Sequence, residues 1–444
     1  MARLKIENLG PIKKMELPVE QFNLIIGEQA TGKSTVCKAI YFFREIKTLL
    51  IDYLYGIAVD GAEENKFPKA LNKRVKDVFI QLFGYSQNMP LDLSAKYEYK
   101  EEISAEIWLR GPSDGKKYFS LDYSVQFRKG VRKIEIMAEE YRNSLREYDG
   151  MSSFAINEKS RIYREITRQV SELLDDDMTT YYIPAGRELL TLLTNQKTRF
   201  DYDTIDLVNR RFMQFIESIQ PKFDGGVSET YQYYPAGNRR FDVHKMADQI
   251  IRDMKGEYIY QKGREYLIEH QSGERILINF ASSGQQELLW LMNQLYILML
   301  RNEKAFVIIE EPEAHVYPAL QRDILEFIVQ FMNFTGSTVL ITTHSPYILM
   351  SANNLYYGGK VIERAPGLKD QIEKILGKGR IISPGRMNGC KLVRTRGETA
   401  VVPLTDEEMG ELSTELIDEI SETINRHYTE LVYLEEDYED TGEG

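Results

Sequence analysis

A glycine-rich segment near the start of the chain carries the most specific chemistry in the sequence. Residues 27–34 read GEQATGKS and fit the pattern G-x-x-x-x-G-K-[ST]. In such a loop the backbone N–H groups point at phosphates, the lysine reaches the β- and γ-phosphates, and the final hydroxyl binds Mg²⁺. The pattern therefore predicts a site for ATP and Mg²⁺, with Ser34 as a metal ligand. The residues expected to contact the nucleotide here are Gly27, Glu28, Gln29, Ala30, Thr31, Gly32, Lys33, Ser34 and Thr35.

Two adjacent carboxylates follow a second apolar segment. Residues 306–309 read FVII, which favours a buried strand, and this strand runs directly into Glu310 and Glu311. We expect Glu310 to help hold Mg²⁺ through water, because glutamate is longer than the aspartate common in Walker B patterns. Glu311 is the candidate that orients or deprotonates the attacking water. An acidic loop after a strand would look the same by itself, but its pairing with the loop at Gly27 favours the catalytic interpretation.

A third apolar segment, Val339 to Thr343, ends at a histidine. His344 lies 33 positions after Glu311 (344 − 311), a spacing that suits a strand, a helix and a strand. Earlier in the chain, residues 282–286 read SSGQQ and precede a strong helical run. The backbone N–H groups at such a helix N-terminus can bind phosphate. A serine there can equally be an ordinary helix cap, and both interpretations stay open.

The order and spacing of these four segments resemble those of an ABC-type ATPase. SSGQQ is similar to the ABC signature LSGGQ, although Ser282 replaces the usual leucine and Gln285 replaces the second glycine. In such proteins two copies of the chain sandwich two nucleotides, because a signature cannot reach the nucleotide of its own subunit. The resemblance therefore implies a homodimer in which Ser283, Gly284 and Gln285 contact the ATP held by the other subunit. It also implies that the histidine after the third segment contacts the γ-phosphate. The catalytic candidates are therefore Lys33, Glu311 and His344.

A narrower resemblance rests on residues 311–321, which read EPEAHVYPALQ. This stretch is similar to the E-P-E-x-H-L-H-P-x-x-Q stretch of OLD-like ABC ATPases, which belong with the RecF and SMC heads rather than with transporters. Val316 and Tyr317 depart from that pattern, in a loop across the dimer face. The opening residues MARLKIENLG are similar to the β-hairpin with which those heads begin. The likeness covers residues 1–50, 90–190 and 270–365, with a looser match in the C-terminal tail.

The OLD-like group includes ATPase subunits of bacterial anti-phage systems such as Septu, PARIS and certain retrons. Their partners are nucleases or other toxic effectors, so the resemblance implies an ATPase that regulates or scaffolds a separate effector protein, as a dimer or a higher oligomer. After His344 we find no Glu followed by an Asp-x-Asp pair, the set that holds two metals in full-length OLD-type nucleases. Destructive activity is therefore expected from another polypeptide. The alternatives are a RecF-like DNA-repair ATPase and a scaffold that scarcely hydrolyses ATP.

Residues 181–187 read YYIPAGR and predict a strand that feeds a helix, at the place where related heads have their Q-loop. No glutamine stands at this turn. Arg187 is therefore either a residue that couples a nucleotide or a partner to the head, or part of a plain β–α turn.

The remaining pattern predicts the elements that position these residues. Apolar periodicity predicts a strand at 22–26 and a helix from Thr35 to Glu45 around the first loop. The expected fold is α/β: an ABC-type P-loop ATPase head, in which helices flank a mixed β-sheet, with an antiparallel β-lobe and an inserted helical arm. Turns near Gly111 and at Lys129-Gly130 would join strands of the lobe. Further helices are expected at 68–83, 158–175, 204–219, 243–254 and 406–434, and further strands at 94–101, 105–110, 118–127, 132–137, 257–278 and 354–363.

Four regions follow from this pattern. The two halves of the ATP site are far apart in the chain, and SMC-like heads carry an insertion at this place. We expect the ATPase core at residues 1–50 and 255–365, a β-lobe with a leading helix at 51–150, a helical insertion at 151–254, and a C-terminal extension with an acidic tail at 366–444.

Composition limits the partners and the compartment. The 444 residues are 43% hydrophobic and carry a net charge of −12 with histidine neutral. A surface that coats nucleic acid is normally basic, so this charge argues against a general nucleic-acid binder, although a local basic patch such as Arg210-Arg211 remains open. The 2 cysteines do not suggest a disulfide framework, and no apolar run is long enough for a membrane span. We expect a cytoplasmic protein.

Overall fold

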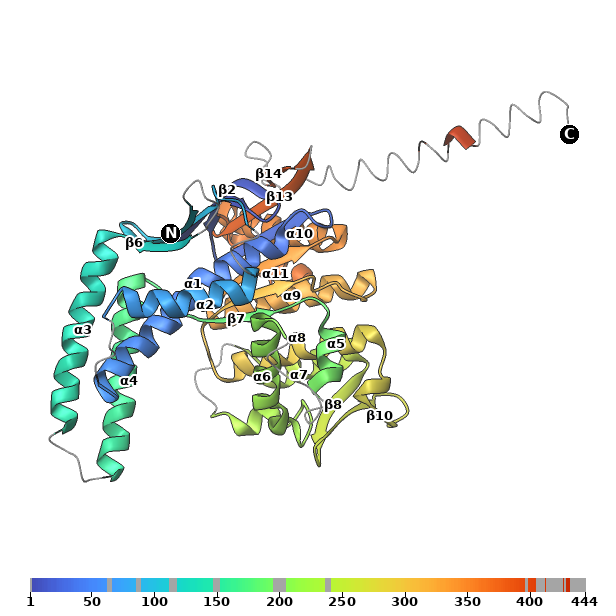
Figure 1. Ribbon diagram of the computed structural model, residues 1–444. Helices are drawn as coiled ribbons and strands as arrows, with labels where there is room; N and C mark the ends of the chain where they lie inside the picture. The colour runs from blue at the N-terminus through green and yellow to red at the C-terminus, as the bar shows by residue number, and fades with distance from the viewer. Residues whose placement is uncertain are drawn as a thin grey trace, which may run out of the picture.

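The computed structural model is built on one large mixed sheet of eleven strands, with helices packed on both faces (Figure 1). A glycine-rich loop and a long helix follow one of the central strands, and an antiparallel lobe extends the sheet. This arrangement confirms the expected α/β class, in which helices flank a mixed β-sheet and an antiparallel lobe extends it. The structure describes residues 2–61, 66–84, 89–111, 118–146, 152–194, 205–235, 241–395, 398–404, 412, 426 and 429–431.

The parallel half of the sheet holds the strands that precede the chemically active segments. It consists of β3 (Phe22–Gly27), β7 (Thr179–Ile183), β11 (Ala305–Glu310), β12 (Thr338–Thr343) and β13 (Met387–Thr395). β3 lies between β12 and β13, and β11 lies between β12 and β7, all in parallel pairing. Every residue of β3, β11 and β12 is buried. Their unbroken apolar sequences follow from this, because both faces of a parallel sheet are covered.

The antiparallel half carries the opening hairpin and the lobe. It consists of β1 (Ala2–Leu9), β2 (Ile12–Val19), β4 (Ser94–Lys100), β5 (Ile103–Arg110) and β6 (Tyr118–Tyr123), and β14 (Glu398–Pro403) joins β2 to β13. Residues of β4 alternate between buried and half-buried, as expected for a sheet with one covered face. The full strand order is β6-β5-β4-β1-β2-β14-β13-β3-β12-β11-β7.

Two apolar cores lie on opposite faces of the parallel strands. In β11, Ile308 packs into the first core, whereas Val307 and Ile309 pack into the second, which is the two-residue period of a strand. The first core is built with α1 (Lys33–Val59), α2 (Lys69–Phe83), α3 (Val125–Arg146) and α4 (Ser152–Leu174). The second is built with α5 (Arg187–Thr194), α6 (Leu207–Ile219), α7 (Val243–Met254), α8 (Ser283–Leu300), α9 (Pro318–Thr335) and α10 (Pro346–Arg364).

A helical hairpin of α3 and α4 projects from the head beside α1 (Figure 1). α6 and α7, which we expected in the inserted arm, pack instead against α8 in the second core. The turn expected at Lys129-Gly130 is wrong, because both residues lie within α3. A Cβ on Gly130 would stand 2.2 Å from Cδ1 of Leu173 in α4. This glycine therefore serves the close approach of two helices rather than a hairpin.

The strand expected at 132–137 is also wrong, since these residues belong to α3. Apolar and charged residues alternate over this short window, which imitates a strand. The buried apolar positions of the whole segment are Phe127, Val131, Ile134 and Ala138, and this spacing of three and four is that of a helix. The window was too short to distinguish the two periods.

The strand expected at 354–363 is wrong for a different reason. These residues lie in α10, where Gly358 and Gly359 look like helix breakers in the sequence. A Cβ on Gly359 would stand 2.1 Å from the carbonyl oxygen of Ile382. The glycine lets the following segment pass close to the helix. The helix expected at 406–434 and the acidic tail lie almost wholly outside the described residues.

A small antiparallel sheet precedes α8 and confirms the strands expected at 257–278. It consists of β8 (Gly256–Gln261), β9 (Arg264–Glu269) and β10 (Arg275–Leu277), followed by the short helix η5 (Ile278–Phe280). Another short helix, α11 (Lys369–Leu376), follows α10. Across the described ranges, none of the helices combines the length and the apolar character that a membrane crossing requires.

Candidate functional site

The glycine-rich loop joins the end of β3 to the start of α1. Ala30 and Gly32 have φ angles of 62° and 103°, so the chain passes through left-handed conformations before the helix begins. A Cβ at Gly27 would lie 2.6 Å from the Leu392 carbonyl oxygen, and one at Gly32 would lie 2.8 Å from Cγ of Pro11. Both glycines are therefore required by packing as well as by the shape of the loop. The β1–β2 turn and β13 pack directly against it.

Two strands near the C-terminal end of the sequence, β13 and β14, contact this loop. The sequence analysis did not predict these two strands. Leu392 in β13 presents its carbonyl to Gly27, and Thr399 in β14 donates its hydroxyl to the Thr31 carbonyl at 3.0 Å. Thr399 is 2% exposed and lies opposite Ile12 of the opening hairpin. No local signal marks these residues, because Thr31 and Thr399 stand 368 positions apart in the chain.

Lys33 is folded back onto its own loop. Its Nζ donates to the carbonyls of Gly27 at 2.8 Å and Glu28 at 2.9 Å. Burial lowers the pKa of Lys33 below its ordinary value, and the carboxylates of Glu311 and Glu313 oppose that shift. The ammonium is thus partly shielded from solvent and lies near carboxylates. Phosphate oxygens would replace the two loop carbonyls as its acceptors.

The three catalytic candidates come together although they follow three different strands, β3, β11 and β12. Nδ1 of His344 lies 3.4 Å from Nζ of Lys33, and its Nε2 lies 3.1 Å from Oε1 of Glu311. Glu311 follows β11 and His344 follows β12, and these strands are parallel neighbours. The carboxyl ends of parallel strands meet at one end of a sheet, which is why the sequence order translated into proximity.

The backbone at Glu311 is unusual. Its φ is +44°, a left-handed conformation that a glutamate rarely adopts, and its N–H donates to the Thr342 carbonyl at 2.9 Å. Such conformations persist where the surroundings hold them, and they occur often at active sites. The direction of this side chain is therefore set by its backbone.

Glu313 is a site residue that the sequence analysis did not single out. One of its oxygens, Oε1, accepts from the hydroxyl of Thr343 and from the backbone N–H of His344, both at 2.7 Å. This carboxylate therefore fixes the end of β12 and the position of His344. In the sequence Glu313 is the second acid of the run EPE at residues 311–313, and that run supported only the family likeness.

Glu310 suits the expected metal role. Its side chain is 7% exposed, Oε2 accepts from the Ala185 N–H at 3.4 Å, and Oε1 is buried with no hydrogen-bond partner among the described residues. The Tyr182 hydroxyl makes no hydrogen bond with Glu310. Burial raises the pKa of this hydroxyl, and the charge of Glu310 raises it further. A buried carboxylate oxygen without a partner is costly, and a divalent cation would satisfy it. Ser34 is exposed in the first turn of α1, so Ser34 and Glu310 would hold Mg²⁺.

The signature stands at the N-terminal end of α8, as expected. Ser282 caps the helix in a capping box with Gln285, so the capping interpretation is confirmed. The Ser283 hydroxyl is exposed and donates to Glu188 at 3.0 Å. A Cβ on Gly284 would lie 2.8 Å from the His315 carbonyl oxygen, so only glycine fits there without movement.

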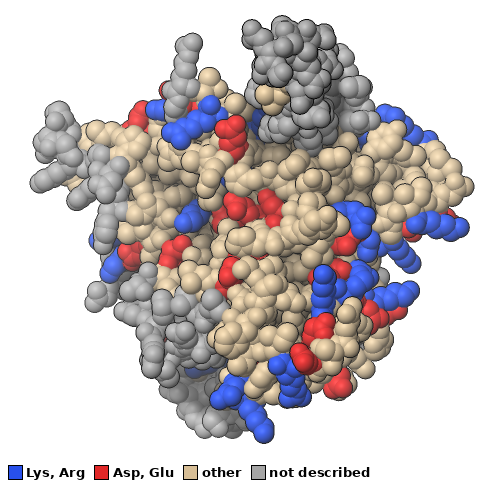
Figure 2. All heavy atoms as spheres, turned by 90° about the vertical axis from the view of Figure 1, so that its right-hand side faces the viewer, with Lys and Arg blue, Asp and Glu red and all other residues tan. Residues whose placement is uncertain are grey.

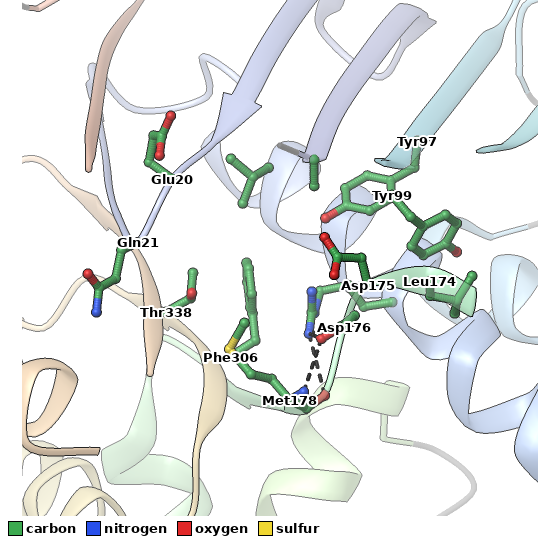
Figure 3. A pocket seen from close by; sticks show the side chains of 13 residues that line it. Glu20, Gln21, Tyr97, Tyr99, Leu174, Asp175, Asp176, Met178, Phe306 and Thr338 are labelled. Carbon is green, nitrogen blue, oxygen red and sulfur yellow. Dashed lines mark hydrogen bonds and ion pairs between the residues drawn. The ribbon is translucent and has the colours of Figure 1, made fainter. Parts of the chain in front are cut away.

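A cavity of about 280 Å³ lies at the opposite end of the parallel strands (Figure 3). Its lining includes Gln21, Phe306 and Thr338, which stand at or just before the N-terminal ends of β3, β11 and β12, whereas the catalytic candidates follow the other ends. In its wall Arg44 pairs with Asp176 at 2.9 Å and lies 4.0 Å from the centre of the Phe306 ring. The cavity therefore lies at the other end of these strands from the candidate nucleotide site.

The loop after β3, the carboxylates after β11 and the histidine after β12 lie together at one end of the parallel strands, as the nucleotide site of a P-loop ATPase would require. The chain belongs to the AAA ATPase domain family, whose model matches residues 1–349. No curated protein matches the chain at a significant level.

Two solved structures illustrate what the chain is similar to. The crystal structure of the SmcHead bound to the C-winged helix domain of ScpA is 13% identical over 92% of this chain and 98% of that chain, with a TM-score of 0.42. The SMC head domain from Thermotoga maritima is 10% identical over 91% of this chain and 98% of that chain, with a TM-score of 0.39. The site is assigned from the family and from the contacts within this chain.

Proposed function

We propose that this chain binds and hydrolyses ATP within a homodimer whose two subunits enclose two nucleotides. In this arrangement the N-terminal end of α8 in one subunit contacts the γ-phosphate held by the other, through Ser283, Gly284 and Gln285. The exposure of Ser283 supports the proposal, since a helix N-terminus that is open to solvent can bind an anion carried by another molecule.

The observation that carries the proposal is a set of exposed apolar side chains beside the signature. Phe280, Leu189 and Tyr317, here called the signature surface, are 79%, 61% and 79% exposed. Phe280 lies two positions before Ser282, the cap of α8. Leu189 follows Glu188, whose carboxylate accepts a hydrogen bond from Ser283. The same carboxylate lies 3.6 Å from His315, and Tyr317 follows two positions later. Large apolar side chains grouped in this way mark interaction sites, and a second subunit would cover them.

The residues of one site would divide the reaction among them. Lys33 leaves its loop carbonyls and neutralises charge on the β- and γ-phosphates. Glu311 orients or deprotonates a water that attacks the γ-phosphorus, while the bond to the β–γ bridging oxygen breaks and ADP leaves. His344 contacts the γ-phosphate while its hydrogen bond to Glu311 is kept. When held by Ser34 and Glu310, Mg²⁺ supplies positive charge against the phosphate oxygens.

We propose further that this cycle regulates or scaffolds a separate nuclease or toxin in anti-phage defence. The likeness of residues 311–321 to OLD-like ABC ATPases supports this role. In the part of the chain that the structure describes, one group of three side chains, Glu188, Glu287 and His315, could reach a single metal ion. Both oxygens of Glu287 already accept backbone N–H groups, from Arg187 and Glu188 at 3.1 Å, so this group does not resemble a nuclease centre.

The surface charge favours a protein partner over duplex DNA. On the face shown in Figure 2, most of the described surface is uncharged, acidic side chains gather near its middle, and Lys and Arg lie mainly toward its edge. A DNA-repair ATPase of the RecF type would need a basic groove and would bind DNA in a strongly salt-dependent way. We expect no such binding from the chain alone, measured by fluorescence anisotropy at low and high salt.

The deciding experiment is the mass in solution of Glu311→Gln, measured by light scattering with and without Mg-ATP. We expect the mass to double with Mg-ATP, and the added substitution Ser283→Arg to prevent doubling while each subunit still binds ATP. A mass that stays that of a monomer would overturn the dimer. A dimer that needs no nucleotide, or that Ser283→Arg does not disturb, would overturn the role of the signature. To test the effector, the chain is co-expressed with the product of the neighbouring gene. We expect the activity of that product to differ between the unchanged chain and Glu311→Gln.

A further inference from the structure

Arg187 is buried between the strand that carries the catalytic carboxylates and the helix that carries the signature. It is 0% exposed at the start of α5. Its Nη1 donates to the carbonyls of Glu310 and Pro184, both at 2.8 Å, and its Nη2 donates to the carbonyl of Glu311 at 3.0 Å. Its Nε donates to the carbonyl of Glu287 at 2.9 Å and lies 3.2 Å from the carboxylate of the same residue. All three nitrogens are thus engaged.

A plain β–α turn needs no such arrangement. Burying a guanidinium is costly, and burial lowers the pKa of Arg187 below its ordinary value, although Glu287 opposes that shift. Glu287 is itself 1% exposed, so the pair places two charges in the interior where apolar side chains would also fill the space. A buried ion pair is weak support for stability by itself. Its position, on the backbone of Glu310 and Glu311, indicates another purpose.

The contact with Glu311 falls on the strained part of the backbone. The φ of +44° at Glu311 needs support from both sides of the residue. Thr342 accepts from its N–H, and Arg187 donates to its carbonyl. Since the backbone angles set the direction of the Cβ, these two contacts aim the carboxylate toward His344, 3.1 Å away. Arg187 can therefore act on the reaction without touching ATP.

The other end of the same side chain holds the signature helix. Glu287 lies four positions after Ser283 (287 − 283), in the next turn of α8. Glu188, which follows Arg187 in α5, accepts from the Ser283 hydroxyl at 3.0 Å. The signature and the catalytic carboxylate of one subunit are thus joined through a short rigid path, with Arg187 at its centre.

We propose that Arg187 is a positioning residue for Glu311 and that it ties this carboxylate to the signature helix of the same subunit. This inference rests on the proposed function, because the signature serves the nucleotide of the other subunit only in the dimer. Movement of α8 against that nucleotide then acts on Glu311 at the subunit's own nucleotide. The two sites of a dimer would in this way respond to each other.

The test compares Arg187→Lys with the unchanged protein in steady-state ATP hydrolysis. Arg187→Ala would leave several buried carbonyls without a donor and the Glu287 carboxylate without its opposite charge, so it is not informative if the protein fails to fold. Lysine keeps the charge beside Glu287 but lacks the fork that reaches the Glu310 and Glu311 carbonyls together. We expect kcat to fall by at least about tenfold, while KM and the Kd for Mg-ATP stay within about twofold.

A double-mutant cycle distinguishes positioning from general damage. If Arg187 acts through Glu311, Arg187→Lys should cause no further loss in single-turnover rate when Glu311→Gln is already present. The matched control is Arg44→Lys, another arginine buried in an ion pair, at the cavity of Figure 3. We expect this control to lower the melting temperature without changing kcat per nucleotide-binding subunit.

The outcomes separate the two proposals. An unchanged kcat in Arg187→Lys, or an equal additional loss in the Glu311→Gln background, would overturn the positioning role while the ATPase itself stood. If Arg187 connects Glu311 to α8, the Hill coefficient for ATP hydrolysis should lie above 1 in the unchanged protein. In Arg187→Lys it should fall toward 1. A coefficient that is 1 from the start, or that does not change, would overturn the tie. An unchanged protein without any ATP hydrolysis would overturn the proposed function instead.

Discussion

Partial burial of the Lys33 ammonium costs free energy, and we expect nucleotide binding to remove that cost. Its ammonium is partly buried, and among the described residues two loop carbonyls and His344 stand within hydrogen-bond reach. We expect Lys33→Met to weaken ATP binding by at least about 100-fold, since a charge-assisted contact to phosphate is lost. The melting temperature without nucleotide should stay the same or rise, because a poorly solvated charge is removed. Calorimetric titration and thermal unfolding check both parts, and tight ATP binding in the variant would disprove the loop assignment.

Glu311→Gln separates binding from chemistry. Glutamine keeps the size of the side chain and can still accept from His344, but it cannot take a proton from water. We expect the Kd for Mg-ATP to change by less than about threefold and kcat to fall by at least about 100-fold. Near-normal turnover, measured by phosphate release, would move the base to another residue, and Glu313→Gln would be the next variant to measure.

The grouping of Lys33, Glu311 and His344 could be predicted because each motif spans only a few positions. Glycines, Lys33 and paired acids have local reasons for their spacing, and the strands before them are plain apolar runs. Glu313 and Arg187 could not be assigned in this way. Their functions come from contacts with backbone groups of other strands, at His344 and Glu311, and such contacts leave no pattern in the sequence.

At the scale of elements, the nucleotide loop depends on β13 and β14. We expect Gly27→Ala to weaken ATP binding by at least about tenfold, which corresponds to about 1.4 kcal/mol, because the new methyl group would press against the Leu392 carbonyl oxygen. The matched control is Gly367→Ala, where a Cβ meets nothing within 4 Å. Equal affinities in the two variants, measured by titration with a fluorescent nucleotide, would show that β13 does not shape the loop.

Thr399→Val tests the same support from β14. The substitution removes the buried hydrogen bond to the Thr31 carbonyl with almost no change in size, and it should lower the free energy of unfolding by about 1–3 kcal/mol. ATP affinity should fall with it, because the carbonyl of the loop is left without its donor. A stability loss with unchanged affinity would mean that β14 supports the sheet and not the loop.

Helices and strands were predictable where one period continued long enough. The buried strands of the core and α7, at Val243–Met254, agree with their sequence patterns. α3 was mistaken for a strand because six residues cannot distinguish a period of two from one of 3.6. β13 and β14 were missed because their place in the sheet is decided by β3 and β2, which lie at the other end of the chain.

At the scale of the whole molecule, the signature surface should govern dimerisation. Phe280→Ser should weaken the ATP-dependent dimer of Glu311→Gln by at least about tenfold and leave the melting temperature of the monomer unchanged, because the ring is 79% exposed. Val125→Ser, at an exposed valine that begins α3, is the matched control and should change neither property. Sedimentation velocity over a concentration series measures both variants. Equal dimer affinities would place the interface elsewhere.

The position of β3 has a consequence for the order in which this protein can be made. β3 leaves the ribosome before its two neighbours in the sheet, β12 and β13, which are synthesised more than 300 residues later. Until residue 399 has emerged, Thr31 lacks its hydroxyl donor and Gly27 lacks its cover. N-terminal segments that await late partners depend on slow, long-range pairing. A nascent chain would therefore carry the phosphate loop before that loop has its support, and we expect ATP binding only after residue 399 has emerged.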